Sequence, residues 1–425
     1  MLDINFIRTH TDLVKNGMKN KGEKDLSAVD RVLKADEEWR ERVTRLEQLR
    51  AENNTKAKKI GQLMGEGKKE EAQALIEETS KNKGALKELE KEINQLREDR
   101  ENLLLRIPNV PHESVPVGET EEDNVIFSTW NQPDPEHADE WQKPHWELAE
   151  AKGWIDFERG AKVTGAGFPF YLGSLARLQR ALINFFLDEG LSKGYREIQA
   201  PYFVNEDSAR GTGNIPDKED MMYVIPRDGF FTIPTAEVPV TNFHRDEILT
   251  AEELPVKYVA YTPCWRREAG SYGKDVRGLN RLHQFDKVEL VKIVEPDTSY
   301  DELESLREDA ESLLQKLELP YRTLLMCTGD MGFTQSKKYD LEVWSAGQKR
   351  WLEVSSCSNF TDFQSRRMQM RYRDENDRIH ITHTLNGSGL ALPRVVAAIL
   401  ETYQLKNGNI TVPEVLQPYM NSEYL

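Results

Sequence analysis

Residues 261–290 read YTPCWRREAGSYGKDVRGLNRLHQFDKVEL, and the rest of the chain is organised around this stretch. Apolar residues stand on both sides of its centre: Val259, Tyr261, Cys264 and Trp265 before it, and Phe285, Val288, Leu290 and Ile293 after it. Residues 268–280 are rich in glycine and charge, which predicts two β-strands joined by a long polar loop. Arg266 and Arg267 end the first strand and Glu289 lies on the second. Guanidinium groups beside a carboxylate favour a substrate that carries both phosphate and amine.

The composition indicates a globular protein with a solvated extension. The 425 residues suffice for two or three domains, and 38% are hydrophobic while 31% are charged. No run approaches the roughly 18 consecutive apolar residues of a membrane span, and the first residues lack a secretory signal pattern. We therefore expect a cytoplasmic protein without a membrane partner. The three cysteines have no CxxC spacing or nearby histidine pair, which predicts reduced thiols and no structural zinc.

The net charge of −16, from 57 basic and 73 acidic residues, argues against a nucleic-acid partner when it is taken alone. Contacts with phosphate are local, however, and need only one basic face of a molecule. The charge balance therefore leaves the question of a nucleic-acid partner open.

Residues 31–106 carry seam positions in alternating steps of four and three, the spacing of a heptad repeat. These positions are Trp39, Val43, Leu46, Arg50, Asn53, Ala57, Ile60 and Met64, then Leu75, Thr79, Asn82, Leu86, Leu89, Ile93, Leu96, Arg100 and Leu103. Gly65 and Gly67 separate the two series, which predicts an antiparallel hairpin of two helices, each about 50 Å long. Residues 1–30 are expected to form a small helical cap. On this pattern, a spacer or dimerisation coil is as good an interpretation as an RNA-binding arm.

The remainder predicts an α+β fold, a mostly antiparallel sheet with helices packed on it. Helical spacing occurs in residues 137–157, 175–191 and 299–317, and strands are expected at 195–201, 230–234, 257–264, 321–326, 340–344 and 350–354. The run TLNGSGLALPR at 384–394 predicts a glycine-rich turn, followed by a helix that Pro393 starts; a simple helix cap is the alternative interpretation of this turn. Neither a Walker A sequence nor a GxGxxG motif is present, so the common phosphate loops are absent from the sequence.

Three stretches, in this order, resemble the motifs of the class II aminoacyl-tRNA synthetases. Residues 176–201 resemble motif 1, residues 259–290 resemble motif 2 and residues 384–402 resemble motif 3. The HQF sequence at 283–285, with Glu289 after it and the hairpin before it, is most similar to the seryl-tRNA synthetase family. The resemblance covers essentially the whole chain. It implies an N-terminal helical tRNA-binding domain in residues 1–110 and an antiparallel-sheet catalytic domain in residues 111–425.

The resemblance also implies a residue set for each substrate. The ATP positions are Arg266, Arg267, Glu268, Leu282, Phe285, Glu353, Val354, Ser355, Ser356 and Arg394. The L-serine positions are Thr235, Ala236, Glu237, Glu289, Asn386 and Ser388. Arg266 and Arg394 are the implied catalytic residues, on the α- and γ-phosphates, and Glu353 and Ser356 the implied Mg²⁺ ligands. Phe285 is expected to stack on adenine.

The resemblance finally implies an activity and its partners. A serine–tRNA ligase converts serine and ATP to seryl-adenylate and pyrophosphate, then transfers serine to the 3′ end of tRNA(Ser) and, as the family usually allows, tRNA(Sec). A homodimer through motif 1 is expected, with the hairpin on the partner subunit's tRNA. The rival interpretations are a threonyl or prolyl synthetase, a ligase that charges a carrier protein, and a non-catalytic RNA-binding paralogue. The hairpin and the lack of an appended domain disfavour the first two, and the intact Arg266, Glu268, Glu353 and Arg394 disfavour the third.

Overall fold

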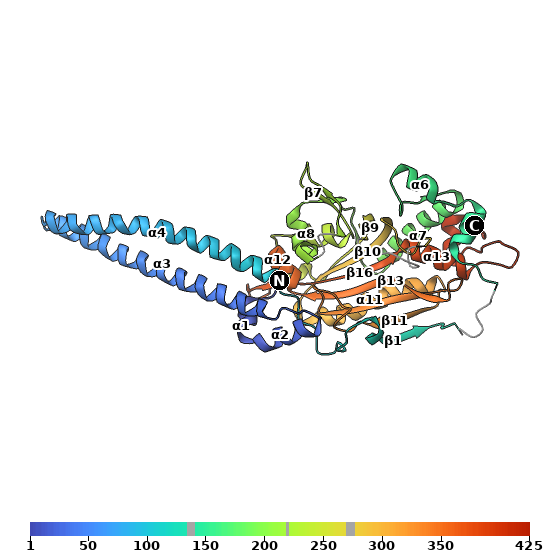
Figure 1. The fold of residues 1–425 in the computed structure, drawn as a ribbon, viewed down its shortest axis with the longest axis horizontal. Helices are drawn as coiled ribbons and strands as arrows, with labels where there is room; N and C mark the ends of the chain where they lie inside the picture. The colour runs from blue at the N-terminus through green and yellow to red at the C-terminus, as the bar shows by residue number, and fades with distance from the viewer. Residues whose placement is uncertain (134–140, 218–220, 269–276) are drawn as a thin grey trace. The chain divides into compact units, whose positions relative to one another are not determined.

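The computed structural model describes residues 1–133, 141–217, 221–268 and 277–425. The chain divides into two compact units, residues 1–19 with 23–108, and residues 20–22 with 109–425 (Figure 1).

The first unit is helical. Its elements are α1 (Ile4–Thr9), α2 (Thr11–Asn20), α3 (Ser27–Gly65) and α4 (Lys69–Leu104). The helices α3 and α4, of 39 and 36 residues, lie side by side as an antiparallel hairpin (Figure 1), which confirms the prediction from the heptad spacing. Gly67, at φ +78°, lies in the turn between them.

Polar residues on the hairpin seam pair with one another across the two helices. The Asn82 side-chain amide donates to Asn53 Oδ1 at 2.8 Å. Nearer the base of the hairpin, Asp36 is 1% exposed and accepts from Arg100 at 3.0 Å, and the Arg100 guanidinium lies 4.2 Å from the centre of the Trp39 ring. These pairs satisfy groups that would otherwise be costly to bury, and they fix the register of the two helices.

The second unit is built on one eight-stranded sheet. The strand order is β1-β11-β12-β13-β16-β10-β9-β4, and every neighbouring pair is antiparallel except β4 and β9. The strands are β1 (Val125–Trp130), β4 (Arg196–Glu197), β9 (Val256–Trp265), β10 (Gln284–Val294), β11 (Tyr321–Leu325), β12 (Lys337–Ser345), β13 (Arg350–Thr361) and β16 (His383–Ala391). This architecture confirms the predicted α+β class.

Smaller elements complete the unit. The short strands are β2 (Ile155–Asp156), β3 (Phe170–Tyr171), β5 (Phe203–Val204), β6 (Val224–Ile225), β7 (Phe230–Thr232), β8 (Ile248–Thr250), β14 (Arg371–Arg373) and β15 (Ile379–Ile381). The helices are α5 (His145–Lys152), α6 (Phe157–Val163), α7 (Gly173–Ser192), α8 (Glu206–Thr212), α9 (Asn214–Asp217), α10 (Glu237–Thr241), α11 (Ser299–Lys316), α12 (Phe363–Met368), α13 (Leu392–Thr402) and α14 (Gln417–Met420).

One face of the large sheet carries the main core. The amphipathic helices α7, α11 and α13 pack on this face, and Leu175, Leu303 and Val395 from the three helices are fully buried in one cluster. None of the described helices combines the length and the apolar character needed to span a bilayer. Cys264, Cys327 and Cys357 are free thiols, as the spacing predicted, and all three are buried.

The interpretation of residues 384–394 as a glycine-rich turn is wrong. Residues 383–391 form β16, in the middle of the sheet. A Cβ on Gly387 would lie 3.0 Å from Cys357 Sγ and 3.2 Å from Leu306 Cγ, and one on Gly389 would lie 3.2 Å from Leu290 Cγ. The glycines therefore make room for core side chains on the helical face, and Pro393 lies in the first turn of α13 as predicted.

The prediction of one helix over residues 137–157 is also wrong. Residues 137–140 lie outside the described residues, and α5 covers only His145–Lys152. Gly153 ends α5 in the left-handed conformation, at φ +65°, and Ile155 then pairs with Tyr171 in a short strand. A glycine at this position satisfies the helix end without the steric cost that a side chain brings.

Candidate active site

A cavity of about 340 Å³ opens on the sheet face opposite α7, α11 and α13. Thirteen of the predicted site residues line it: Thr235, Glu237, Arg266, Glu268, Leu282, Phe285, Glu353, Val354, Ser355, Ser356, Asn386, Ser388 and Arg394. Among the remaining three, Arg267 is exposed outside the lining, Ala236 is fully buried, and Glu289 lies buried beneath the cavity wall. Residues from five separate stretches of sequence therefore meet in one place.

The strand β10 explains how the sequence divides its side chains between core and cavity. Successive residues of a strand point to opposite faces. Val288 and Leu290 are buried in the main core, whereas Phe285 and Lys287 line the cavity. Glu289 continues the second series, and it lies opposite Ser388 of β16.

Glu289 is the centre of the polar end of the cavity. Its side chain is 0% exposed, and its Oε2 lies 2.5 Å from Lys287 Nζ. Asn386 Nδ2 donates to Glu289 Oε1 at 2.8 Å, and Lys287 also donates to Thr235 Oγ1 at 2.7 Å. A buried carboxylate is tolerated only when it is paired in this way.

A second carboxylate, Glu237, lies beside Asn386. Asn386 Nδ2 is 3.1 Å from Glu237 Oε2, and Gln364 Nε2 donates to Glu237 Oε1 at 2.7 Å. Gln364 in turn accepts from Thr384 Oγ1 at 2.7 Å. Two fixed carboxylates with amide and hydroxyl groups between them suit an ammonium group and a hydroxyl group on a small ligand.

The other end of the cavity is cationic and aromatic. The Arg266 guanidinium lies 5.2 Å from the centre of the Phe285 ring, and Arg266 Nε donates to the Pro234 carbonyl at 3.2 Å. Arg394 donates from Nε to the Asn280 carbonyl at 3.0 Å and from Nη1 to the Glu353 carbonyl at 2.7 Å. Two guanidinium groups held by backbone carbonyls form a preorganised site for a polyanion.

Glu353 and Ser356 offer oxygen ligands between these cations. Ser356 Oγ donates to Glu353 Oε1 at 3.1 Å. Desolvation in the site raises the pKa of Glu353, but the charges of Arg394 and Lys338 outweigh it and hold the pKa below its ordinary value. Asp340 lies opposite Ser356 on β12, and its buried Oδ1 has no hydrogen-bond partner among the described residues. A site with one or two carboxylate ligands suits Mg²⁺, because this ion completes its coordination shell with phosphate and water oxygens. No group of three or more metal-binding acidic, histidine or cysteine side chains occurs in the described part of the chain.

Two lysines that line the cavity, Lys287 and Lys338, are not among the residues predicted from the sequence. Lys287 lies between Phe285 and Glu289 at the same period of two, so the strand alternation is a signal that identifies it. Lys338 Nζ lies 3.0 Å from Asp340 Oδ2 across from the Glu353 stretch, and only the β12–β13 pairing brings it there. Glu268, one of the expected ATP positions, forms an ion pair with Arg281 at 2.8 Å.

Two protein-family models match the chain. The "Seryl-tRNA synthetase N-terminal domain" matches residues 1–111, and the "tRNA synthetase class II core domain (G, H, P, S and T)" matches residues 224–403.

Individual proteins match over the full length of the chain. The serine–tRNA ligase of Salinibacter ruber is 58% identical over 99% of this chain and 98% of its own length. The crystal structure of seryl-tRNA synthetase from Pyrococcus horikoshii complexed with ATP superposes with a TM-score of 0.94 at 38% identity, and covers 100% of this chain and 99% of its own. The cytoplasmic serine–tRNA ligase from Naegleria fowleri in complex with AMP gives a TM-score of 0.89 at 28% identity, covering 100% and 98%. The chain therefore belongs to the seryl-tRNA synthetase family of class II aminoacyl-tRNA synthetases, the serine–tRNA ligases.

Proposed function

We propose that this serine–tRNA ligase works by forming seryl-adenylate in the cavity and then transferring serine to the 3′ end of tRNA(Ser). The observation that supports this most directly is the placement of paired carboxylates at one end of the cavity and two guanidinium groups at the other. The reaction joins a carboxylate to the α-phosphate of ATP, so two anions must be brought together and the negative charge that develops must be stabilised.

In this proposal, each end of the cavity takes one substrate. Glu237 and Glu289, with Thr235, Asn386 and Ser388, receive the ammonium and hydroxyl groups of serine. Alanine is rejected because it lacks the hydroxyl group that donates to Glu289, so this contact is lost. Threonine is excluded by size.

The nucleotide occupies the cationic end. Arg266 contacts the α-phosphate and the serine carboxylate, Arg394 contacts the γ-phosphate, and Phe285 stacks on adenine. We infer that Glu353 and Ser356 would hold Mg²⁺, which would supply positive charge against the triphosphate. No side chain needs to act as a nucleophile, since the 3′-terminal hydroxyl of the tRNA attacks the adenylate. The protein contributes position and charge.

Two further parts of the proposal concern partners. Residues 1–110 are proposed to bind tRNA through the α3–α4 hairpin, and residues 111–425 to carry the catalysis. A homodimer through α7 and β4 is supported by a group of large apolar side chains on and near these elements that are exposed in one chain: Phe157, Phe170, Leu172 and Leu191. Charging of tRNA(Sec) is proposed from the family resemblance.

Serine-dependent exchange of pyrophosphate into ATP, run without tRNA beside each of the other amino acids, tests the proposal. The expected result is exchange with serine alone. Exchange with another amino acid, or with none, would contradict the proposed chemistry. Aminoacylation of tRNA(Ser) and tRNA(Sec) transcripts then tests the two tRNA partners separately, and sedimentation velocity tests the dimer.

A further inference from the structure

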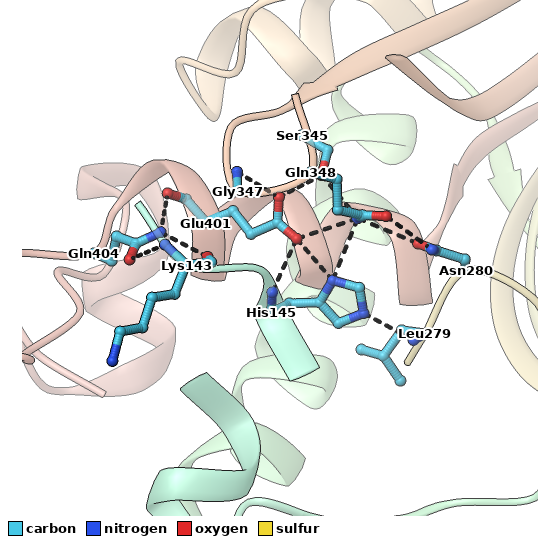
Figure 2. Close-up of polar contacts among 9 residues, drawn as sticks. All are labelled: Lys143, His145, Leu279, Asn280, Ser345, Gly347, Gln348, Glu401 and Gln404. Carbon is cyan, nitrogen blue, oxygen red and sulfur yellow. Dashed lines mark hydrogen bonds and ion pairs between the residues drawn. The ribbon is translucent and has the colours of Figure 1, made fainter. Parts of the chain in front are cut away.

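A buried polar cluster lies behind the wall of the cavity, outside the proposed substrate contacts. Figure 2 shows its members, which we call the His145 cluster: His145, Asn280, Ser345, Gln348 and Glu401. They come from the start of α5, the segment that precedes β10, the last residue of β12 with the turn that follows it, and the last turn of α13. His145 and Glu401 are both 0% exposed.

Glu401 is the anchor of the cluster. Its Oε1 accepts from the His145 backbone amide at 2.9 Å, from His145 Nδ1 at 2.8 Å and from Gln348 Nε2 at 3.2 Å. Its Oε2 accepts from Ser345 Oγ and from the Gly347 amide. Burial raises the pKa of Glu401, but the hydrogen bonds from His145 and Ser345 outweigh burial and hold the pKa below its ordinary value. Glu401 is thus a carboxylate with five donors, which ties α13 to two other segments.

His145 connects Glu401 to the backbone of the cavity wall. Its Nε2 accepts from the backbone amide of Leu279 at 2.8 Å, so the ring carries its proton on Nδ1, toward Glu401 (Figure 2). Gly278 has φ +66°, and a Cβ there would lie 2.3 Å from His145 Nε2. The close approach of ring and backbone therefore requires glycine at this position.

Gln348 and Asn280 complete the connection to Arg394. Their side-chain amides face each other, with Asn280 Nδ2 donating to Gln348 Oε1 at 2.9 Å and Gln348 Nε2 3.4 Å from Asn280 Oδ1. The Asn280 backbone carbonyl accepts from Arg394 Nε at 3.0 Å. Leu279, Asn280 and Arg394 all line the cavity.

Residues 277–283 belong to no helix or strand, so no regular backbone ladder fixes them. Backbone hydrogen bonds tie His283 to Gly167 and Arg266, and a 3.5 Å turn bond joins the Asn280 amide to Arg277. Side-chain hydrogen bonds hold the Leu279 amide and the Asn280 side chain. We propose that the His145 cluster is a positioning unit, which fixes the backbone of Leu279 and Asn280 and through it the orientation of Arg394 toward the nucleotide. The use of Arg394 on ATP rests on the proposed function. The cluster touches no reacting group, and its members act through Arg394 and the wall.

Gln348→Ala is the sharpest test, because Gln348 is only partly buried in a turn, whereas His145 and Glu401 lie in the core. Its control is Gln315→Ala, which removes the same type of side chain and its hydrogen bond to the Tyr321 hydroxyl at 2.7 Å, far from the cavity in sequence and in the sheet. Arg394→Lys retains the cation and removes the Nε donor, so it breaks the last link of the chain of contacts.

The experiment measures the ATP dissociation constant by calorimetry and the KM values for ATP and serine by ATP–pyrophosphate exchange. The proteins are the full-length wild type, both single variants, the double variant and the control. Loss of the hydrogen bond between Gln348 and Asn280 predicts a rise of about 3- to 10-fold in the dissociation constant and the KM for ATP in Gln348→Ala. The KM for serine is expected to stay unchanged. In the Arg394→Lys background the same substitution is expected to change ATP binding less than 2-fold, since the link is already broken.

Hydrogen exchange gives a readout that does not depend on activity. The amides of residues 277–283 are expected to exchange faster in Gln348→Ala than in the wild type and the Gln315→Ala control. Three results would each overturn the positioning role. The first is an unchanged rate of hydrogen exchange at residues 277–283, and the second is an equal effect of Gln348→Ala on ATP binding with Arg394 and with Lys at position 394. The third is a rise in the KM for serine as large as the rise in the KM for ATP. If the wild type binds ATP but catalyses ATP–pyrophosphate exchange with no amino acid, the proposed function is contradicted. The hydrogen-exchange result then decides alone whether the cluster positions the wall.

Discussion

The buried pair of Lys287 and Glu289 offers the most demanding test of the serine site. Lys287→Met keeps the approximate volume of the side chain and removes its charge. Lys287 and Glu289 side chains are 6% and 0% exposed, and their charged atoms are 2.5 Å apart. Removing one partner of such a pair leaves an uncompensated buried charge, which costs about 3–5 kcal/mol of unfolding free energy. At about 2 °C per kcal/mol for a unit of this size, Tm should fall by about 6–10 °C.

Activity and stability should separate in the double variant. Lys287→Met with Glu289→Gln removes both charges, so most of the stability should return. The anionic acceptor for serine is lost, however, and a hydrogen bond to a charged group is worth about 1.5–3 kcal/mol. The kcat/KM for serine should therefore stay about 10- to 100-fold below that of the wild type.

Thermal unfolding and serine-dependent exchange, measured on the same preparations, check both parts. The control is Lys257→Met on the neighbouring strand, where Nζ lies 3.7 Å from Glu302 Oε2 and the side chain is 26% exposed. A partly exposed pair at this distance contributes about 0–1 kcal/mol. If Lys287→Met loses no more stability than the control, the inference of a buried, compensated carboxylate is refuted. If the double variant retains the wild-type kcat/KM for serine, Glu289 is not the acceptor for serine.

Three further outcomes are expected. Arg394→Ala should lower the rate of ATP–pyrophosphate exchange at least about 1,000-fold and leave the sedimentation coefficient unchanged. The reason is that one charge-stabilising contact contributes a factor of about 10²–10³ to kcat, and the substitution also removes the hydrogen bond to the Glu353 carbonyl. Retained ATP–pyrophosphate exchange contradicts the role of Arg394 on the phosphate. Deletion of residues 32–104 should spare exchange and abolish charging of tRNA(Ser), and unchanged charging would reduce the hairpin to a spacer. Burial lowers the pKa of His383 from 6.5 to about 4, so its protonation favours the unfolded chain and stability should decline as pH falls from 6.5 toward 4, by up to about 3 kcal/mol. His383→Gln should flatten that decline in a denaturant titration, and an equally steep decline in the variant argues against His383 as its source.

The local sequence determined much of this protein. The heptad spacing predicted the α3–α4 hairpin, since a seam of this period is buried only when two helices pair. The apolar series around residues 261–290 predicted β9 and β10, and the motif resemblance gave the family and thirteen of the residues that line the cavity. These features depend on neighbours in sequence or on short patterns, so they can be read without coordinates.

Other features depend on which strands lie side by side, and only the tertiary structure decided them. Residues 383–391 form a strand because their glycines leave room for Leu306 and Leu290, which are far away in sequence. Lys338 and Asp340 reach the Glu353 stretch through the pairing of β12 with β13. The His145 cluster joins residues 145, 280, 345, 348 and 401, whose individual types carry no periodic signal. A local pattern records only the burial of each residue, whereas long-range packing determines its hydrogen-bond partners.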